Sequence, residues 1–256
     1  MARIISIVNQ KGGVGKTTTA INTAIALAHH GHRVLLVDLD PQANATSGLG
    51  IDYRKVEQGV YEALAGDIRP VDAIRASGRE RVDILPATPN LAGATVELVT
   101  VDRREFRLAD ALGELNDLYD VIVIDCPPSL GLLTVNALTA ADEVLIPVQC
   151  EYFSLDGLDQ LLDTIHLVRE NLKADLKVLG IVLTMYEEAS PLTSGVFHGI
   201  YQHSPYRVFR SVVPRNFHLA EAPSYGRSIF EHQHDSDGAR AYRRLAREIL
   251  YSPKHS

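Results

Sequence analysis

A run of glycines and lysines near the amino terminus carries groups that can bind phosphate. Residues 11–18 read Lys-Gly-Gly-Val-Gly-Lys-Thr-Thr. Glycines let successive backbone N–H groups converge on anionic oxygens, and a following helix adds the partial positive charge of its N-terminus. Lys16 suits the β- and γ-phosphates, the Thr17 hydroxyl suits Mg²⁺, and Thr18 can reach the α-phosphate. The predicted nucleotide site consists of Lys11, Gly12, Gly13, Val14, Gly15, Lys16, Thr17 and Thr18.

The loop departs from the usual G-x-x-x-x-G-K-[ST] pattern at its first position. Gln10 stands where that pattern has a glycine, and Lys11 adds a second lysine to the loop. Two lysines exceed what one bound nucleotide needs. We therefore expect Lys11 to point away from its own site or across to a second one.

Carboxylates follow two of the predicted strands. Asp38 and Asp40 come at the end of the apolar run 33–38, and Asp125 ends the β-branched run 119–125. In doubly wound sheets, ligands lie beyond the carboxyl ends of the strands, so these side chains should face the phosphate loop. Asp125 is expected to hold a Mg²⁺-bound water. A capped turn without a ligand is the alternative for residues 38–46.

Hydrophobic patterning predicts an α/β fold with a mostly parallel, twisted sheet flanked by helices on both faces. Buried strands are predicted at 4–8, 33–38, 82–86, 119–125, 143–148, 178–185 and 208–214. Helices are predicted at 20–28, 155–172 and 239–250, with further helix within 51–81 and 91–118. No linker, repeat or low-complexity tract interrupts the chain, so we expect residues 1–256 to form a single domain.

Residues 11–18 resemble the deviant Walker A motif of the ParA/MinD ATPases, a family of P-loop NTPases. The resemblance implies that ATP and Mg²⁺ are bound and that two subunits form an ATP-sandwich homodimer in which Lys11 contacts the partner's nucleotide. It gives catalytic roles to Lys11, Lys16 and Asp40, with Asp40 positioning or activating the attacking water. Asp38 would support the lysine and the metal, while Thr17 and Asp125 (through water) hold the metal. Thr184, Met185, Pro214 and Asn216 stand where the family surrounds adenine.

Within that family the chain looks most like the chromosome-partitioning ATPases called ParA or Soj, over nearly its whole length. This implies slow ATP hydrolysis stimulated by a ParB/Spo0J-type protein, and non-specific binding of double-stranded DNA by the ATP-bound dimer. Ala189 and His218 replace two arginines that the family often has. The DNA-contact candidates that remain are Arg227, Arg240, Arg243, Arg244 and Arg247.

Charge is unevenly distributed along the chain. The formal net charge is -7, which argues against a protein that coats nucleic acid over its whole surface. From Ile200 onwards, however, Lys and Arg outnumber Asp and Glu by nine to five, which is compatible with local DNA contact. No signal peptide, lipidation motif or membrane-spanning run is evident, so we expect a cytoplasmic protein, associated with the nucleoid if it binds DNA.

Several alternatives stay open at this point. The basic amphipathic segment 239–250 is expected to dock on the body and contact DNA, but it could instead anchor a MinD-like positioning ATPase to a membrane. A further alternative is a metabolic enzyme that uses the same loop, such as an ATP-dependent ligase or amidase-type synthetase. Cys126 and Cys150 are most simply buried, although four thiolates from two chains could hold an iron–sulfur cluster. The histidines at 29, 30 and 32 suit a solvated helix end better than a metal site.

Overall fold

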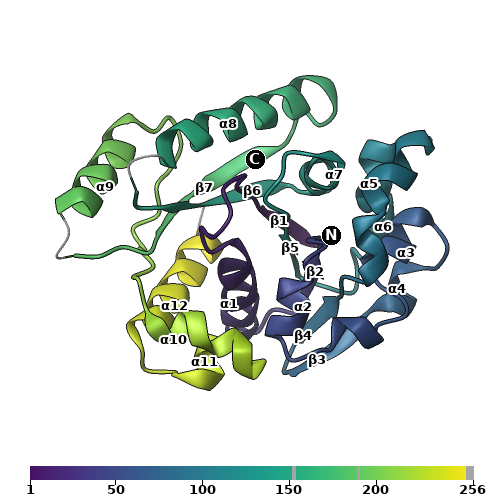
Figure 1. The fold of residues 1–256 in the computed structure, drawn as a ribbon, viewed down its shortest axis with the longest axis horizontal. Coiled ribbons are helices and arrows are strands. Elements are labelled where there is room, and N and C mark those ends of the chain that lie inside the picture. The colour runs from purple at the N-terminus through teal and green to yellow at the C-terminus, as the bar shows by residue number, and fades with distance from the viewer. Residues whose placement is uncertain (152–153, 189–190, 252–256) are drawn as a thin grey trace.

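A seven-stranded sheet organises the chain in a computed structural model, which describes residues 1–151, 154–188 and 191–251 (Figure 1). The strands are β1 (Arg3–Ile7), β2 (Val34–Asp38), β3 (Arg75–Arg79), β4 (Val82–Leu85), β5 (Val121–Asp125), β6 (Glu143–Gln149) and β7 (Lys177–Thr184). Their spatial order is β3-β4-β2-β5-β1-β6-β7. Every neighbouring pair is parallel except β3 with β4. The predicted α/β class with a mostly parallel sheet is confirmed.

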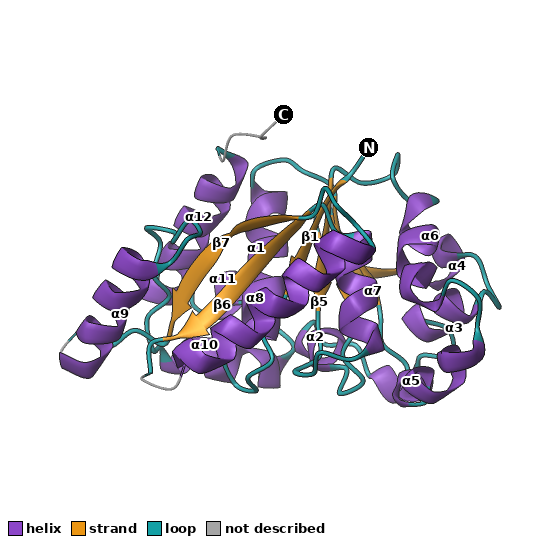
Figure 2. Cartoon of the chain, turned by 90° about the horizontal axis from the view of Figure 1, so that it is seen from above, coloured by secondary structure: helices purple, strands orange, loops and turns teal. Residues whose placement is uncertain are grey.

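Helices pack on both faces of this sheet (Figure 2). The α-helices are α1 (Lys16–His29), α2 (Asn44–Gly48), α3 (Val60–Ala65), α4 (Pro70–Ala73), α5 (Ala94–Glu97), α6 (Arg107–Gly113), α7 (Leu132–Ala140), α8 (Ser154–Asn171), α9 (Pro191–His203), α10 (Phe217–Glu221), α11 (Ile229–His232) and α12 (Asp237–Leu250). Short 3₁₀ turns are η1 (Tyr53–Lys55), η2 (Pro89–Ala92), η3 (Leu98–Thr100), η4 (Arg104–Phe106) and η5 (Ala222–Tyr225).

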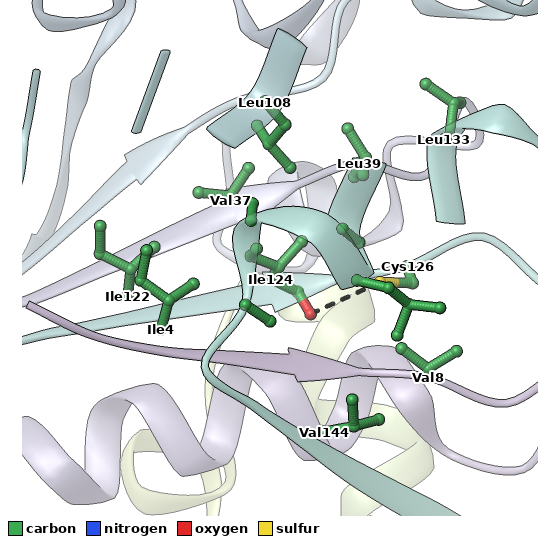
Figure 3. Close-up of a cluster of buried hydrophobic side chains, with 14 of the residues drawn as sticks. Ile4, Val8, Val37, Leu39, Leu108, Ile122, Ile124, Cys126, Leu133 and Val144 are labelled. Carbon is green, nitrogen blue, oxygen red and sulfur yellow. Dashed lines mark hydrogen bonds between the residues drawn. The ribbon is translucent and has the colours of Figure 1, made fainter. Parts of the chain in front are cut away.

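Successive residues of a strand contribute side chains to two separate hydrophobic cores, because side chains alternate between the two faces of the sheet. On β5, Ile122 and Ile124 lie in the core under α3, α6, α7 and α8, and Cys126 continues this series (Figure 3). Val121 and Val123 point the other way, into the core formed with α1, α11 and α12. Because both faces are covered, the central strands are mostly apolar, as in other parallel sheets. The exceptions include Ser6 within β1 and the aspartates that end β2 and β5.

The helical prediction for residues 51–81 is partly wrong. Helices α3 and α4 do form there, but Arg75–Arg79 is an antiparallel edge strand that returns to β4 through Glu80 and Arg81. Arg81 and Gly78 both take positive φ values, 61° and 77°, which turn the chain tightly. A strand made of arginine, alanine, serine and glycine gives no β-branched signal, so its sequence does not reveal it. The helix predicted within 91–118 is broken into α5, α6 and 3₁₀ turns.

The strand predicted at Val208–Pro214 is not formed. This segment lies beside β7, with bridges from Val208 to Ile181 and from Pro214 to Tyr186. Between them, the Phe209 and Val213 N–H groups donate to the Ile181 and Leu183 carbonyls, both at 2.8 Å, but no continuous strand forms. Between the two bridges, the backbone N–H groups of Arg210 and Ser211 donate to the Glu248 carboxylate of α12, at 3.0 and 2.7 Å. The Phe209 and Val213 N–H groups face β7, so the alternating pattern would turn the Ser211 N–H toward β7 as well. Because the Ser211 N–H donates to Glu248 instead, the ladder with β7 is interrupted.

Candidate nucleotide-binding site

The glycine loop joins the carboxyl end of β1 to the start of α1. Gly15 immediately precedes the helix with φ +88°, and Gly13 has φ +76°, conformations that side-chain-bearing residues rarely adopt. Apart from the adjoining residues, no described heavy atom lies within 4 Å of the position that a Cβ would take on Gly12 or Gly13. The loop therefore leaves open space next to a helix N-terminus, as a bound anion requires.

Gln10, the residue that departs from the usual loop pattern, is held by a neighbouring helix. Its Nε2 atom donates to the Gln160 side chain at 2.8 Å and to the Gly157 carbonyl at 3.3 Å, both on α8. The preceding Asn9 accepts the Lys11 N–H at 2.9 Å and donates to the Pro147 carbonyl at 2.7 Å. These contacts fix the start of the loop to β6 and α8 without a glycine at position 10.

Lys16 lies inside the loop, with only 7% of its surface exposed. Its Nζ atom donates to the Lys11 carbonyl at 3.0 Å. Burial lowers the pKa of Lys16, while Asp125, Cys126 and Asp40 act in the opposite direction. A partly desolvated ammonium with one protein contact is a strong attractor for phosphate oxygens.

Asp38 and Asp125 lie side by side at the carboxyl ends of β2 and β5, where they are partners in the strand register. Both are completely buried. Asp38 accepts hydrogen bonds from the Thr46 N–H at 2.7 Å, the Thr46 hydroxyl at 2.6 Å and the Asp40 N–H at 3.3 Å. Burial raises the pKa of Asp38 to about 6, against the effect of these hydrogen bonds.

Asp125 is different, because within the described part of the chain neither of its carboxylate oxygens has a donor in hydrogen-bond geometry, although the Thr17 hydroxyl lies near enough to act on its pKa. Burial and the nearby Asp38 raise the pKa of Asp125 well above its usual range, and Thr17 and Lys16 oppose this rise. A buried carboxyl group without partners is costly unless a ligand completes its surroundings. The position beside Thr17 therefore fits a hydrated divalent cation.

Asp40 faces the same space from the segment after β2. Its Oδ1 atom accepts the Gln42 N–H at 2.9 Å, and only 5% of the residue is exposed. Among the described residues, its other oxygen makes no hydrogen bond. A carboxylate held by one oxygen with the other one available can accept a proton from a water molecule.

Lys11 does not face this pocket. Its Nζ atom lies 3.0 Å from Glu151 Oε2, and the Gln149 side chain donates to the other Glu151 oxygen at 2.6 Å. The Lys11 and Glu151 side chains are 36% and 45% exposed. The expectation that Lys11 points away from its own site agrees with this placement.

A cavity of about 690 Å³ brings most of the predicted residues together. Of the predicted nucleotide and metal residues, it is lined by Gly12, Gly13, Gly15, Lys16, Thr17, Thr18, Asp40, Thr184, Met185, Pro214 and Asn216. Val14, Asp38 and Asp125 are buried beneath its wall, and the Thr184 hydroxyl donates to the Val14 carbonyl at 2.9 Å. A cavity of this size is typical of a small-molecule site.

Part of the cavity wall was not predicted as site residues. Leu219, Ala220, Pro223 and Ser224 come from α10 and η5, and Tyr242 comes from α12. Asn216 caps α10 by accepting the Leu219 N–H at 3.2 Å, which brings that helix to the cavity. Tyr242 is 1% exposed, and its hydroxyl lies 3.1 Å from that of Thr19. The apolar periodicity of 239–250 indicates burial, but it does not reveal that Tyr242 lies next to a cavity.

The five candidate arginines lie apart from the loop, and they differ in accessibility. Arg227, Arg240, Arg244 and Arg247 are exposed, whereas Arg243 is half-buried with its guanidinium 5.4 Å from the Phe230 ring centre. Arg247 also lines a shallow groove with Arg207 and Arg210, two residues that the sequence did not single out. His218 is half-buried on α10, and Ala189, the other departure from the family pattern, lies outside the described residues.

The apolar face of α12 is already occupied. Leu245, Ala246 and Ile249 are completely buried in the core that α12 shares with α1. The predicted docking of this helix is confirmed. Among the described residues, no helix is both long and apolar enough to cross a membrane.

Cys126 and Cys150 are both buried, with 0% and 3% exposure, as expected for small apolar side chains. Burial raises the pKa of the Cys150 thiol to about 12. Neither thiol is presented at the surface of this chain, as a cluster shared between two chains would require, so the iron–sulfur alternative is disfavoured.

Comparison with known proteins agrees with this geometry. Residues 2–178 match a family described as an AAA domain. The sporulation initiation inhibitor protein Soj of Bacillus subtilis is 52% identical over 249 residues, 97% of this chain and 98% of that protein. The chain belongs to the ParA/Soj family. A chromosome partitioning protein ParA from Myxococcus xanthus is 51% identical, over 98% of this chain and 88% of that protein.

A solved structure of similar fold contains a bound nucleotide. A Mycobacterium smegmatis protein described as cobyrinic acid a,c-diamide synthase was crystallised with ADP and magnesium. It is 39% identical, covers 98% of this chain and 94% of its own, and superposes with a TM-score of 0.87. Such similarity shows that the two chains share a P-loop ATPase fold.

Proposed function

We propose that this chain is an ATPase of DNA partitioning, which binds ATP with Mg²⁺ and uses hydrolysis to switch between two states. The observation that carries the proposal is the pair of unpartnered Asp125 oxygens, buried beside an open glycine loop and a desolvated lysine. In a chain 52% identical to Soj, this arrangement is best explained as a site for a metal-bound triphosphate.

The residues fit Mg²⁺ through oxygen atoms alone. Thr17 would contribute its hydroxyl directly, and Asp125 would act through a bound water, with Asp38 supporting from the next strand. The cation neutralises phosphate charge when bound. Lys16 and the backbone N–H groups of residues 12–18 would hold the phosphates, and Met185, Pro214 and Asn216 would enclose the adenine.

Asp40 would position the attacking water. One of its oxygens is fixed by the Gln42 N–H, which leaves the other to accept a hydrogen bond from water in the cavity. Hydrolysis by the isolated chain should be slow, because a further positive charge or partner commonly completes such sites. A ParB/Spo0J-type protein is the proposed stimulating partner.

Lys11 would complete the site of a second copy. Its ion pair with Glu151 is substantially exposed, and exposed pairs contribute about 0–1 kcal/mol. Breaking this pair therefore opposes dimer formation only weakly. We propose an ATP-bound homodimer in which each Lys11 contacts the partner's nucleotide, and which binds double-stranded DNA non-specifically, at the nucleoid, through the exposed arginines.

Replacement of Asp40 and Lys11 tests this scheme. Asp40→Ala should lower ATP turnover by about 10²–10⁴-fold and hold the protein as an ATP-bound dimer, because binding survives and hydrolysis does not. Lys11→Ala should remain monomeric with ATP. Lys55→Ala, which removes an exposed lysine paired with Asp52, is the control. Light scattering that shows only monomer for Asp40→Ala with ATP would contradict the scheme.

An ATP-dependent amide-forming enzyme is the second candidate, favoured by the name of the 39% identical Mycobacterium smegmatis protein. It would require a second substrate before ATP turns over. Turnover that rises with duplex DNA and not with glutamine plus a carboxylic acid would exclude it. A membrane anchor at α12 is disfavoured, because its apolar face would have to leave the core.

A further inference from the structure

Two histidines and a glutamate meet on the outer side of the cavity wall. His218 and Glu221 lie on α10, and His232 is the last residue of α11. His232 Nε2 lies 2.9 Å from Glu221 Oε2, and His218 Nδ1 lies 3.9 Å from the same oxygen. One nitrogen of each histidine and one Glu221 oxygen all lie within 4.8 Å of one another.

Local structure brings these three side chains together. His218 and Glu221 are three residues apart, so they share one face of α10. The chain then reverses at Gly226, which has φ +63°, and a capping box between Ser228 and Glu231 starts α11. The two short helices are neighbours at the edge of the molecule in Figure 1.

Neighbouring residues orient the cluster but do not neutralise the Glu221 carboxylate with a lysine or arginine, as far as the described residues show. The Tyr225 ring stacks on His232 with ring centres 5.3 Å apart, which orients the imidazole. Within the described residues, no lysine or arginine forms an ion pair with Glu221. The His218, Glu221 and His232 side chains are 44%, 29% and 15% exposed, so solvent reaches the cluster from the His218 side.

We propose that His218, Glu221 and His232 bind a divalent transition-metal ion of the zinc class. Two imidazoles and one carboxylate are ligands for zinc, cobalt or nickel, whereas Mg²⁺ prefers oxygen atoms alone. With bonds of about 2.0–2.2 Å, tetrahedral ligands lie roughly 3.3–3.5 Å apart. The 2.9 and 3.9 Å separations lie on either side of that value, so small side-chain movements form the site. Water takes the remaining position.

A metal bound by these side chains would restrict the movement of the segment that forms one wall of the cavity. Leu219, Ala220, Pro223 and Ser224 line the cavity from the same short segment that carries His218 and Glu221. A metal bond to His232 would tie that segment to α11, which packs on α12. Binding to the folded chain alone then raises its unfolding temperature by mass action. Metal binding by these three side chains requires neither bound nucleotide nor ATP hydrolysis.

Metal titration of the nucleotide-free chain, with excess MgCl₂ present to occupy oxygen-only sites, tests the proposal. We expect one equivalent of CoCl₂ to give the visible absorption of nitrogen-ligated cobalt, and ZnCl₂ to displace it in calorimetry. His232→Ala and His218→Ala should each weaken binding by about 100-fold or more, since loss of even an outer-shell partner costs 10–100-fold. Metal should raise the unfolding temperature of the wild type but not of His218→Ala or His232→Ala.

The double variant His30→Ala/His32→Ala is the matched control, because it removes two histidines from the run that ends α1. It should bind like the wild type. His218→Ala keeps the test valid if His232→Ala fails to fold, since His218 is nearly half exposed. The proposal is overturned if the wild type binds no cobalt through nitrogen, if His218→Ala binds as tightly as the wild type, or if the control loses the site.

Discussion

Asp38 and Asp125 are two carboxyl groups buried at neighbouring strand ends, and they make stability depend on pH. The pKa of Asp38 in the folded chain is about 6, against an ordinary value of 3.8. The folded chain therefore holds this proton where the unfolded chain has lost it. The stability that results is present below pH 3.8 and is lost as pH rises to about 6.

Asp38→Asn should remove this dependence. Without nucleotide or Mg²⁺, the wild-type free energy of unfolding should fall by about 1–3 kcal/mol more than that of the variant as pH rises from 3.8 to about 6. Urea unfolding at a series of pH values measures the difference. Asp117→Asn, at an exposed aspartate, should retain the wild-type slope. An equal slope in Asp38→Asn would refute the assignment.

From residue types and spacing, the chemistry of the loop can be predicted, whereas the contacts around the loop largely cannot. Glycines before Lys16 and carboxylates after apolar runs already indicate a phosphate site, because strand ends and helix starts must meet there. The partner of Lys11 was not predictable, since Glu151 lies 140 residues away and its position depends on β6. The contact of Tyr242 with the cavity was equally unpredictable, because the apolar periodicity of 239–250 indicates burial and not which groups a buried side chain touches.

At the scale of elements, the contact between α12 and the segment 208–214 is a feature that sequence could not predict. Glu248 accepts from the Arg210 N–H, the Ser211 N–H and the Ser211 hydroxyl. Valines at 208, 212 and 213 favour a strand, but strand formation also depends on hydrogen bonds to a neighbouring strand. Here the Glu248 side chain of α12 accepts the Ser211 N–H instead. By contrast, β1, β2 and β5 were predictable because burial on both faces makes them rich in consecutive apolar residues.

Glu248→Ala should destabilise the chain by about 1–3 kcal/mol, because the Ser211 N–H, on a residue only 3% exposed, loses its acceptor. Denaturant unfolding measures this loss. Asp235→Ala, an acidic residue on the surface before α12, should change stability by less than about 0.5 kcal/mol. Equal stability of Glu248→Ala and the wild type would show that the segment is held by other contacts.

At the scale of the whole molecule, the exposed arginines predict salt-dependent DNA binding by the ATP-bound state. Arg244→Ala/Arg247→Ala is the informative double variant, since Arg243 is partly engaged with Phe230. Each lost phosphate contact should reduce the slope of log K against log salt by about 0.9. DNA co-sedimentation at several salt concentrations measures the slope. Arg54→Ala/Arg69→Ala, at exposed arginines paired with Asp52 and Asp72, should leave it unchanged.

The whole chain should also unfold as one unit. Strands from Arg3 to Thr184 share one sheet, and α12 packs on α1 at the other end of the sequence. We therefore expect a single transition in which calorimetric and van't Hoff enthalpies agree. Two resolved transitions would divide residues 1–256 into separate domains.

The two edge strands of the sheet, β3 and β7, limit how copies of this chain can associate. β3 is short, irregular between Ala76 and Arg79, and carries two arginines, while β7 is partly covered by the segment around Val208. The unpaired N–H and C=O groups of an exposed edge strand can hydrogen-bond to a strand of another chain. An irregular register, charged side chains and a covering segment each hinder such pairing. The chain is thereby protected against open-ended fibres. The pairing that we propose through the nucleotide face could then be a closed and reversible event.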